Sequence, residues 1–149
     1  MSNIAKRVDL VSIKLVKESS FLYATRKITS PNDAYELMKD KFESVDREQF
    51  IIACLNTKNE PTNISVVSVG TLNKTIVHPR EVFKTAILSN ACSIVAFHNH
   101  PSGDTKPSQQ DIQLTNRLYE AGELLGIKLL DHLIIGDGTF TSLKEKGYL

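Results

Sequence analysis

Cysteine is scarce in this chain, because only Cys54 and Cys92 occur among its 149 residues. Two cysteines cannot build the dense disulfide framework of a small secreted domain, and a reducing compartment is consistent with their number. Both lie in apolar stretches, so we expect them to fill core space. An apolar setting raises the pKa of a thiol, which argues against Cys92 as a nucleophile.

Long apolar runs and an excess of one charge are also missing. No stretch approaches the roughly 20 apolar residues of a membrane-spanning helix, and the N-terminus shows no uninterrupted apolar core of a signal peptide. The formal net charge is +1 and the basic residues are scattered, so the charge demands neither a nucleic acid nor an anionic membrane as partner. We therefore expect a cytoplasmic protein that works without a membrane.

The pattern that remains alternates between strands and helices. A chain of this length suits one domain with a sizeable core, so we expect residues 1–149 to form a single domain, with 1–45 as an extension of it. The alternation argues for an α/β fold. Apolar periodicity and capping residues predict strands at 8–17, 50–55, 64–69, 93–97, 127–135 and around 139–143, and helices at 31–42, at 79–89 and after Ser108.

The residues that carry chemistry gather between His98 and Asp111. His98 and His100 follow the apolar run 93–97, which predicts a buried central strand. Side chains two residues apart on a strand point to the same face, so both imidazoles can converge on one ion. Pro101 ends the strand, and a turn leads to a helix with Asp111 in its first turn. Two imidazoles and a carboxylate suit zinc, and three protein ligands leave one position open for catalysis.

Ser108 and Asp111 also have a purely structural interpretation. Ser-x-x-Asp is a capping box, in which Ser108 caps a helix and Asp111 stands at its third position. The chain has another such box at Ser30 and Asp33, with no histidine near it. The metal hypothesis therefore depends on the joint pattern with the histidines and not on these two residues alone.

The spacing of the motif resembles a known signature. His-x-His, seven residues and then Ser-x-x-Asp are typical of the JAB/MPN (JAMM) metalloprotease superfamily, and His98, His100, Ser108 and Asp111 match it. From about Glu48 to the C-terminus the chain resembles the RadC family of bacterial JAB-domain proteins, in the segments HPREVFKTAILSNACSIVAFHNHPSGDTKPSQQDIQLT, LLDHLIIGDG and SLKEKGYL. The resemblance implies a mixed β-sheet flanked by helices, similar to the cytidine deaminase-like architecture. It also implies zinc held by His98, His100 and Asp111, with water in the fourth position.

The same resemblance implies a glutamate that acts as general acid and base, at the start of an early core strand. Glu48 matches this position best, because it leads directly into the apolar strand 50–55. Glu81 is the main rival and is nearer to the histidines in sequence. It follows Pro79 in the first turn of a helix, where an acidic residue is ordinary. Glu60 stands in a turn, where we expect it to be solvated.

Together these residues predict a zinc-dependent hydrolase that acts on a peptide, isopeptide or other amide bond. Metal-activated water would attack the carbonyl, and Glu48 would carry the proton to the leaving amine. In the JAMM pattern the Ser108 hydroxyl donates a hydrogen bond to the oxyanion. We expect one Zn²⁺ per chain and a peptide or protein substrate, and a homo-oligomer is compatible with the sequence.

Two other functions compete with hydrolysis of amides. The family's name points to DNA repair or mobile elements, with a role as nuclease or accessory protein. Nuclease sites often use two metals and several carboxylates, whereas this cluster supplies one ligating carboxylate. Many RadC proteins carry helix-hairpin-helix sequence upstream, which we do not expect here because the chain starts close to the JAB core. A non-enzymatic interaction module is the third reading, and the presence of all the ligands argues against it.

Four further polar residues have open roles. Asp131 and His132 lie in an apolar strand, where buried polar groups need partners. Asp131 could accept the second N–H of a metal-bound histidine, or the pair could be satisfied locally. We expect His78 in a turn rather than as a ligand. We expect Arg80 to pair with Glu81 or another carboxylate, or to contact substrate.

Overall fold

The computed structural model describes residues 3–70 and 77–149, and over these residues five strands form one mixed sheet in the order β2-β1-β3-β4-β5. β3 and β4 are parallel and α3 connects them, whereas the other neighbouring strands are antiparallel. The predicted α/β fold, a mixed sheet flanked by helices, is confirmed. The strands are β1 (Gln49–Leu55), β2 (Pro61–Val69), β3 (Ser93–Asn99), β4 (Lys128–Ile135) and β5 (Phe140–Ser142), and the helices are α1 (Pro31–Glu43), α2 (Pro79–Leu88) and α3 (Gln109–Leu125).

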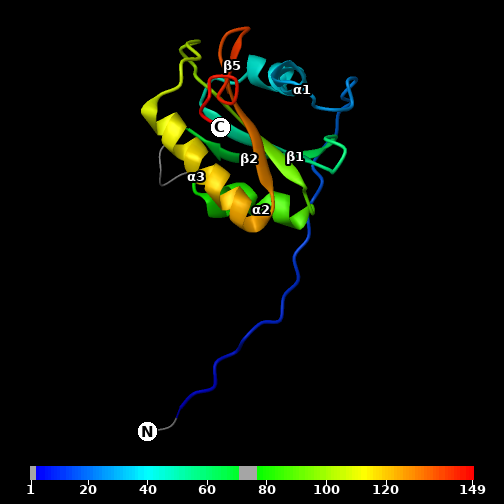
Figure 1. The fold of residues 1–149 in the computed structure, drawn as a ribbon. Coiled ribbons are helices and arrows are strands. Elements are labelled where there is room, and N and C mark those ends of the chain that lie inside the picture. Colours follow the sequence, from blue (N-terminus) through cyan, green and yellow to red (C-terminus); the bar gives the residue numbers. More distant parts are fainter. Residues whose placement is uncertain (1–2, 71–76) are drawn as a thin grey trace.

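Helices cover both faces of the sheet (Figure 1). α1 packs on one face, where Met38 joins an apolar cluster with Ile51 of β1. α2 and α3 cover the opposite face, where Phe83 joins a second cluster with Phe50 of β1. The central strands β1 and β3 are buried along almost their whole length, which accounts for their continuous apolar sequence. Successive side chains of these strands therefore alternate between the α1 side and the α2–α3 side.

The bounds of the elements from α1 onward lie close to the expected ones. β2 begins at Pro61, three residues before the expected position, because the β1–β2 turn is closed within residues 56–60. α1 begins where the second capping box predicts, since the Ser30 hydroxyl accepts a hydrogen bond from the N–H of Asp33. Among the described residues no helix has both the length and the apolar character needed to cross a membrane.

The strand expected at 8–17 is wrong. Residues 3–22 form neither helix nor strand, and Figure 1 shows them leading away from the sheet as an extended segment. An alternating apolar pattern marks a segment that can become a strand, but a strand forms only where a neighbour shares its ladder of hydrogen bonds. In the part of the chain that the structure describes, no strand pairs with this segment.

The two cysteines differ in their surroundings. Cys54 lies in β1 and is buried as expected, and burial raises the pKa of its thiol to about 11. Cys92 is exposed, so the expectation that it fills core space is wrong. It lies in the short connection between α2 and β3, and its backbone N–H donates to the carbonyl of Leu55. The apolar residues around it belong to the neighbouring elements and leave the connection itself at the surface.

Candidate metal centre

The site lies where β1 begins and β3 ends. Their antiparallel register places Phe50 opposite His98, so both side chains lie on the α2–α3 side of the sheet. Continuing this register two residues beyond the last strand pair predicts that Glu48 lies opposite His100. The pKa of His100 is raised, chiefly by its hydrogen bond to Asp111, and the nearby charge of Glu48 adds to this shift. The register therefore brings the candidate base and a candidate ligand together.

Asn99 fastens the two strands at this end. Its Oδ1 accepts a hydrogen bond from the N–H of Gln49 at 2.7 Å, and its Nδ2 donates to the carbonyl of Arg47 at 3.0 Å. Both bonds reach the backbone on either side of Glu48. The residue between the two histidines thus holds the backbone of the candidate base in place, while its own side chain lies away from theirs.

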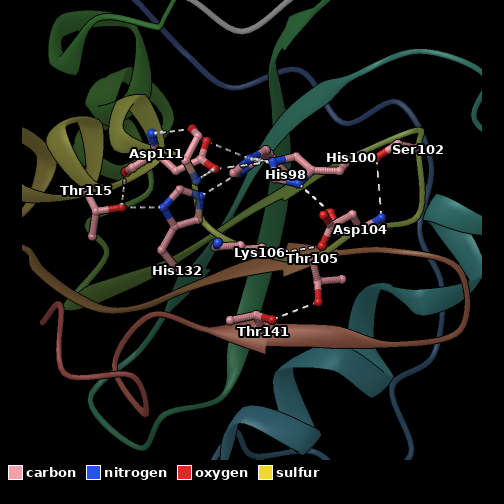
Figure 2. Close-up of polar contacts among 11 residues, drawn as sticks. His98, His100, Ser102, Asp104, Thr105, Lys106, Asp111, Thr115, His132 and Thr141 are labelled. Carbon is pink, nitrogen blue, oxygen red and sulfur yellow. Dashed lines mark hydrogen bonds and ion pairs between the residues drawn. The ribbon is translucent and has the colours of Figure 1, made fainter.

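Three side chains, those of His98, His100 and Asp111, converge at this end of the sheet, as Figure 2 shows. Among the described residues, His98, His100 and Asp111 form a group that could hold a metal ion, with one ligand atom from each within 4.8 Å of the others. His98 Nε2 lies 3.0 Å from His100 Nε2 and 3.1 Å from Asp111 Oδ1, and His100 Nε2 lies 3.2 Å from Asp111 Oδ2. Tetrahedral zinc with bonds of about 2.0–2.1 Å separates its ligands by about 3.3 Å. The donor atoms are therefore close to the spacing that zinc requires.

Asp111 is presented by the first turn of α3. Its N–H donates to Ser108 Oγ at 3.1 Å, and the N–H of Ser108 donates to Asp111 Oδ2 at 2.8 Å, which completes the predicted capping box. Burial alone would raise the pKa of this carboxyl, but hydrogen bonds to His100 and His98 outweigh burial and hold the pKa well below its usual range. With its side chain only 3% exposed, Asp111 is a buried anion that requires a positive partner.

His100 is oriented by the loop that follows β3. Its Nδ1 lies 2.7 Å from the carbonyl oxygen of Asp104. A carbonyl only accepts, so Nδ1 carries a proton and the lone pair of neutral His100 is on Nε2, facing Asp111. Gly103 makes the turn possible, because its φ of +86° is a conformation that other residues rarely adopt. The His100 side chain is 18% exposed and forms the more open side of the group.

His98 is oriented from inside the protein by a chain of three hydrogen bonds (Figure 2). Thr115 Oγ1 donates to the carbonyl of Asp111 at 2.7 Å and so uses its only proton. His132 Nδ1, 2.7 Å from the same Oγ1, must therefore donate to it. Burial lowers the pKa of His132 well below its usual value, so the ring is neutral and its Nε2 accepts from His98 Nδ1 at 2.8 Å. These bonds leave the lone pair of His98 on Nε2, directed at His100 and Asp111.

A bulge in β4 decides which of two neighbouring polar residues reaches the site. The pairing of β4 with β3 shifts by one residue between Leu129 and Asp131. After this shift His132 pairs with Ala96, which lies on the α2–α3 side, whereas Asp131 pairs with Val95 on the α1 side. His132 therefore belongs to the site and Asp131 faces away from it.

Asp131 is satisfied by its own neighbours. Its carboxylate accepts from the N–H of His132 at 2.7 Å, from the Ser142 hydroxyl at 2.6 Å and from the N–H of Lys144 at 3.2 Å. Burial raises the pKa of this carboxyl, and the hydrogen bonds partly offset the rise. His98 Nδ1 thus has His132 as its partner rather than Asp131, and Asp131 fastens the segment after β5 to the sheet.

Thr115 is the member of this arrangement that the sequence analysis missed. It lies four residues after Asp111 and so on the same face of α3. This spacing of four residues is the feature of the sequence that could have pointed to Thr115. It is not enough to assign a role in the site, because a threonine within a helix often bonds the carbonyl four residues earlier without any further role. The second contact of its hydroxyl, with His132, depends on the β4 bulge and is not visible in the pattern.

The other candidate residues lie outside the metal group. Glu81 forms ion pairs on α2 with Lys84 at 2.8 Å and with Arg80 at 3.8 Å, and the Arg80 side chain is 73% exposed. His78 caps α2, since its Nδ1 accepts from the N–H of Arg80 at 3.0 Å. Glu60 accepts hydrogen bonds in the β1–β2 turn. The expected roles of His78 as a turn residue and of Glu81 as an ordinary helix residue match these contacts.

An open pocket lies at Glu48 and at Pro101, the residue that follows His100. It has a volume of about 400 Å³ and is lined by Arg47, Glu48, Gly70 and Pro101. Glu48 therefore contributes both to the wall of this pocket and to the surroundings of His100. The arrangement combines a ligand set for one cation, a carboxylate that can exchange a proton and space for a second molecule.

Comparison with known proteins identifies the family. The model of the RadC-like JAB domain matches residues 28–148. A UPF0758 protein of Clostridium acetobutylicum is 54% identical over 123 residues, which are 83% of this chain and 54% of the relative. The UPF0758 protein YsxA of Bacillus subtilis is 50% identical over 136 residues, or 91% of this chain and 57% of the relative. A UPF0758 protein of Methanosarcina barkeri is 51% identical over 124 residues, or 83% of this chain and 54% of the relative.

The chain spans about half the length of the curated relatives it matches. The match includes the whole of the sheet, the three helices and the metal group. It confirms the resemblance on which the expected fold rested. This chain belongs to the family of RadC-like JAB domains.

Proposed function

We propose that this domain is a zinc-dependent hydrolase that cleaves an amide bond in a peptide or protein. The observation that carries the proposal is the convergence of His98, His100 and Asp111 beside an open pocket. Two imidazole nitrogens and one carboxylate oxygen form a donor set that suits zinc and leaves one position for a reacting molecule. The hydrogen bonds of His98 and His100 direct a lone pair from each ring toward the same point.

Zinc held by these three residues would lower the pKa of water to about 7 and polarise a substrate carbonyl. Glu48 is the residue of this chain that we assign to proton transfer. Its charge contributes to the raised pKa of His100, and it lines the pocket. There its carboxylate accepts a proton from the attacking water and returns it to the leaving amine.

Ser108 is the residue that we assign to the developing oxyanion. Its Oγ accepts a hydrogen bond from the N–H of Asp111, which uses a lone pair of the hydroxyl and not its proton. The capping role and the donation of a hydrogen bond to substrate are therefore compatible in the same side chain. Such a donor typically contributes about 10²–10³ in rate.

Glu48→Gln tests the proposal. The amide has nearly the shape of the carboxylate but cannot take up a proton, so we expect hydrolysis to fall by about 10²–10⁴-fold. Zinc content should stay unchanged, because Glu48 is outside the metal group. Glu81→Gln is the matched control and should keep wild-type activity. The measurement is cleavage of a panel of peptides and isopeptide-linked peptides, followed by mass spectrometry.

A Glu48→Gln protein as active as the wild type would refute the assigned base. The same panel includes single-stranded and double-stranded DNA, because the family name RadC points to DNA. Metal-dependent cleavage of DNA without cleavage of any amide would overturn the proposed reaction. The single carboxylate of the metal group and the net charge of +1 favour the amide.

We propose the cytoplasm as the compartment of this activity. Both cysteines are free thiols, and a reducing compartment preserves such thiols. Cys92 in particular is exposed.

A further inference from the structure

Residues 3–22, which we call the N-terminal arm, carry an apolar surface that nothing in the described chain covers. No hydrogen bond of the described residues involves the arm, and it contains neither helix nor strand. Monomeric proteins rarely expose so much contiguous apolar surface. Nine large apolar side chains of the arm are exposed: Ile4, Val8, Leu10, Val11, Ile13, Leu15, Val16, Phe21 and Leu22.

The centre of the arm has the pattern of a strand. In the extended conformation Val11, Ile13 and Leu15 lie on one face, and Ser12 and Lys14 lie on the other. Valine and isoleucine favour strands because their branched side chains pack well on a pleated surface. An isolated strand leaves its backbone groups and its apolar face in water. The arm therefore has the chemistry of a strand whose neighbour must come from elsewhere.

β2 offers an edge of matching length. Among the described strands it pairs with β1 alone, and its nine residues equal the length of the segment 8–16. The sequence PTNISVVSV has no charged side chain to protect this edge, and its protection is confined to Pro61 at the start and two irregularities in its pairing with β1. Val66 and Val69 on this strand are 43% and 53% exposed. The opposite edge strand, β5, has only three residues and is too short to accept the arm.

The root of the arm directs it away from its own sheet. The N–H of Ile28 donates to the carbonyl of Asn59 at 2.9 Å, and Arg26 forms an ion pair with Glu60. These contacts fix the root at the β1–β2 turn. From there the arm leads away from the body of the protein, as Figure 1 shows. In this conformation segment 8–16 does not pair with β2 of its own chain and is available to the β2 edge of a second molecule.

The apolar area of the arm is sufficient for a stable contact. An aliphatic side chain of this size presents roughly 100 Å² of apolar surface when fully exposed. Weighted by their exposed fractions, the nine side chains of one arm offer roughly 700 Å², of which roughly 450 Å² belongs to segment 8–16. One partner of a standard interface contributes about 800 Å². Two arms exchanged in reciprocal fashion would bury this area twice, together with the edges that receive them.

We propose that two copies of this chain form a dimer in which segment 8–16 of each arm adds as a strand to the free edge of β2 in the other copy. The exchange is two-fold symmetric, so it closes at the dimer and leaves no free arm for further growth. It covers the exposed apolar surface of the arm and, together with it, an edge of β2 that no other described strand occupies. The inference does not depend on the reaction that the metal centre performs.

Sedimentation of the full chain over a range of concentrations tests the arm. The wild type should sediment as a dimer, and Ile13→Lys should raise its dissociation constant by at least about 100-fold, because a charge would enter the apolar face of the added strand. Ser12→Lys is the matched control on the opposite face and should change the constant by less than about threefold. Neither variant touches the core, so both should keep the circular dichroism and the thermal unfolding of the wild-type body.

The β2 side of the contact is tested in the same way. Val66→Lys should also weaken the dimer by at least about 100-fold, whereas Val66→Thr, which keeps the branched shape, should weaken it less. Hydrogen exchange of the unsubstituted protein is an independent measurement: amides within 8–16 should be protected at dimer concentrations and lose this protection on dilution.

Three results would overturn the inference. The first is a wild type that sediments as a monomer at every concentration. This holds also if its arm amides are protected, because the arm would then pair with β2 of its own chain. The second is a dimer that survives Ile13→Lys. The third is a dimer that is lost in Ile13→Lys but survives in folded Val66→Lys, because the arm would then pair with a different surface.

Discussion

The positions of a few protons decide whether the three side chains can take a metal. Thr115 gives its only hydroxyl proton to the carbonyl of Asp111 and must accept from His132. His132 then accepts from Nδ1 of His98, which leaves the Nε2 lone pair of His98 directed at the metal group. A metal site whose ligands are already oriented loses little entropy on binding, and partners of this kind tune affinity in known sites.

Replacing Thr115 tests this chain of bonds. In Thr115→Val the hydroxyl is lost and His132 is free to carry its proton on Nε2, facing His98. His98 would then have to carry its own proton on the nitrogen that faces the metal group. We expect zinc affinity to fall by about 10–100-fold in Thr115→Val and to be kept in Thr115→Ser. A chelator competition titration measures the affinity, and ¹⁵N chemical shifts of the imidazoles report the tautomers. Equal zinc affinity in all three proteins would show that Thr115 only supports the fold.

The metal-free protein should have a characteristic pH dependence. The hydrogen bond between His100 and Asp111 raises the pKa of His100. The stability that this contact contributes is therefore present below about pH 6.5 and is lost as pH rises through the raised pKa. The pKa of Asp111 is lowered, so its contribution is present above about pH 4 and is lost on further acidification. The contribution of this contact to the free energy of unfolding should therefore peak between about pH 4 and 6.5, whereas the lowered pKa of buried His132 costs stability in every variant as pH falls below about 6.5.

Urea unfolding of the metal-free protein at several pH values measures this profile. Asp111→Asn should flatten it, since both shifts depend on the carboxylate. Zinc affinity should change in the opposite sense and rise with pH, because the metal competes with the proton for Nε2 of His100. Above pH 6.5 the free energy of unfolding should fall more steeply in the wild type than in Asp111→Asn. Equal slopes in the two proteins, or a shallower one in the wild type, would contradict the coupling between His100 and Asp111.

At the scale of elements, the sequence predicted the position of the site residues where these residues also mark the end of a strand or the start of a helix. The apolar run of β3 and the capping box of α3 indicated that His98, His100 and Asp111 meet, and the distances agree. The bulge that brings His132 to the site left no trace in the pattern of β4, because one extra residue in a buried apolar strand changes its phase but not its composition. Segment 8–16 shows the converse, since its strand pattern is clear but no neighbour in the described chain completes it.

Ser108→Ala separates the two roles of the residue that caps α3. Loss of a helix cap costs about 1 kcal/mol of stability and leaves turnover nearly unchanged. Loss of a donor to the oxyanion lowers kcat by about 10²–10³-fold. We expect both effects, with the larger one on kcat. Thermal unfolding and kcat measured on the same preparation distinguish them, and a variant with reduced stability but full turnover would leave Ser108 as a cap only.

At the scale of the whole molecule, the fold places the metal group where three elements meet. The end of β3 and the first turn of α3 contribute the metal group, and the start of β1 places the candidate base Glu48 next to it. The two apolar clusters on either side of the sheet keep these parts in place. His98 and Asp111 are buried and His100 is partly exposed, whereas Glu48 lines the pocket. The body of the fold therefore holds the ligands, and the proposed chemistry would take place at its surface.

Zinc stoichiometry tests this account most directly. Metal-free wild type, His100→Ala and His78→Ala are incubated with zinc, passed through a desalting column and assayed for metal by mass spectrometry. His78→Ala is the control, because His78 caps α2 and is outside the metal group. We predict one zinc per chain in the wild type and in His78→Ala and none in His100→Ala. A wild type that retains no zinc, or a His100→Ala protein that retains as much as the wild type, would contradict the account.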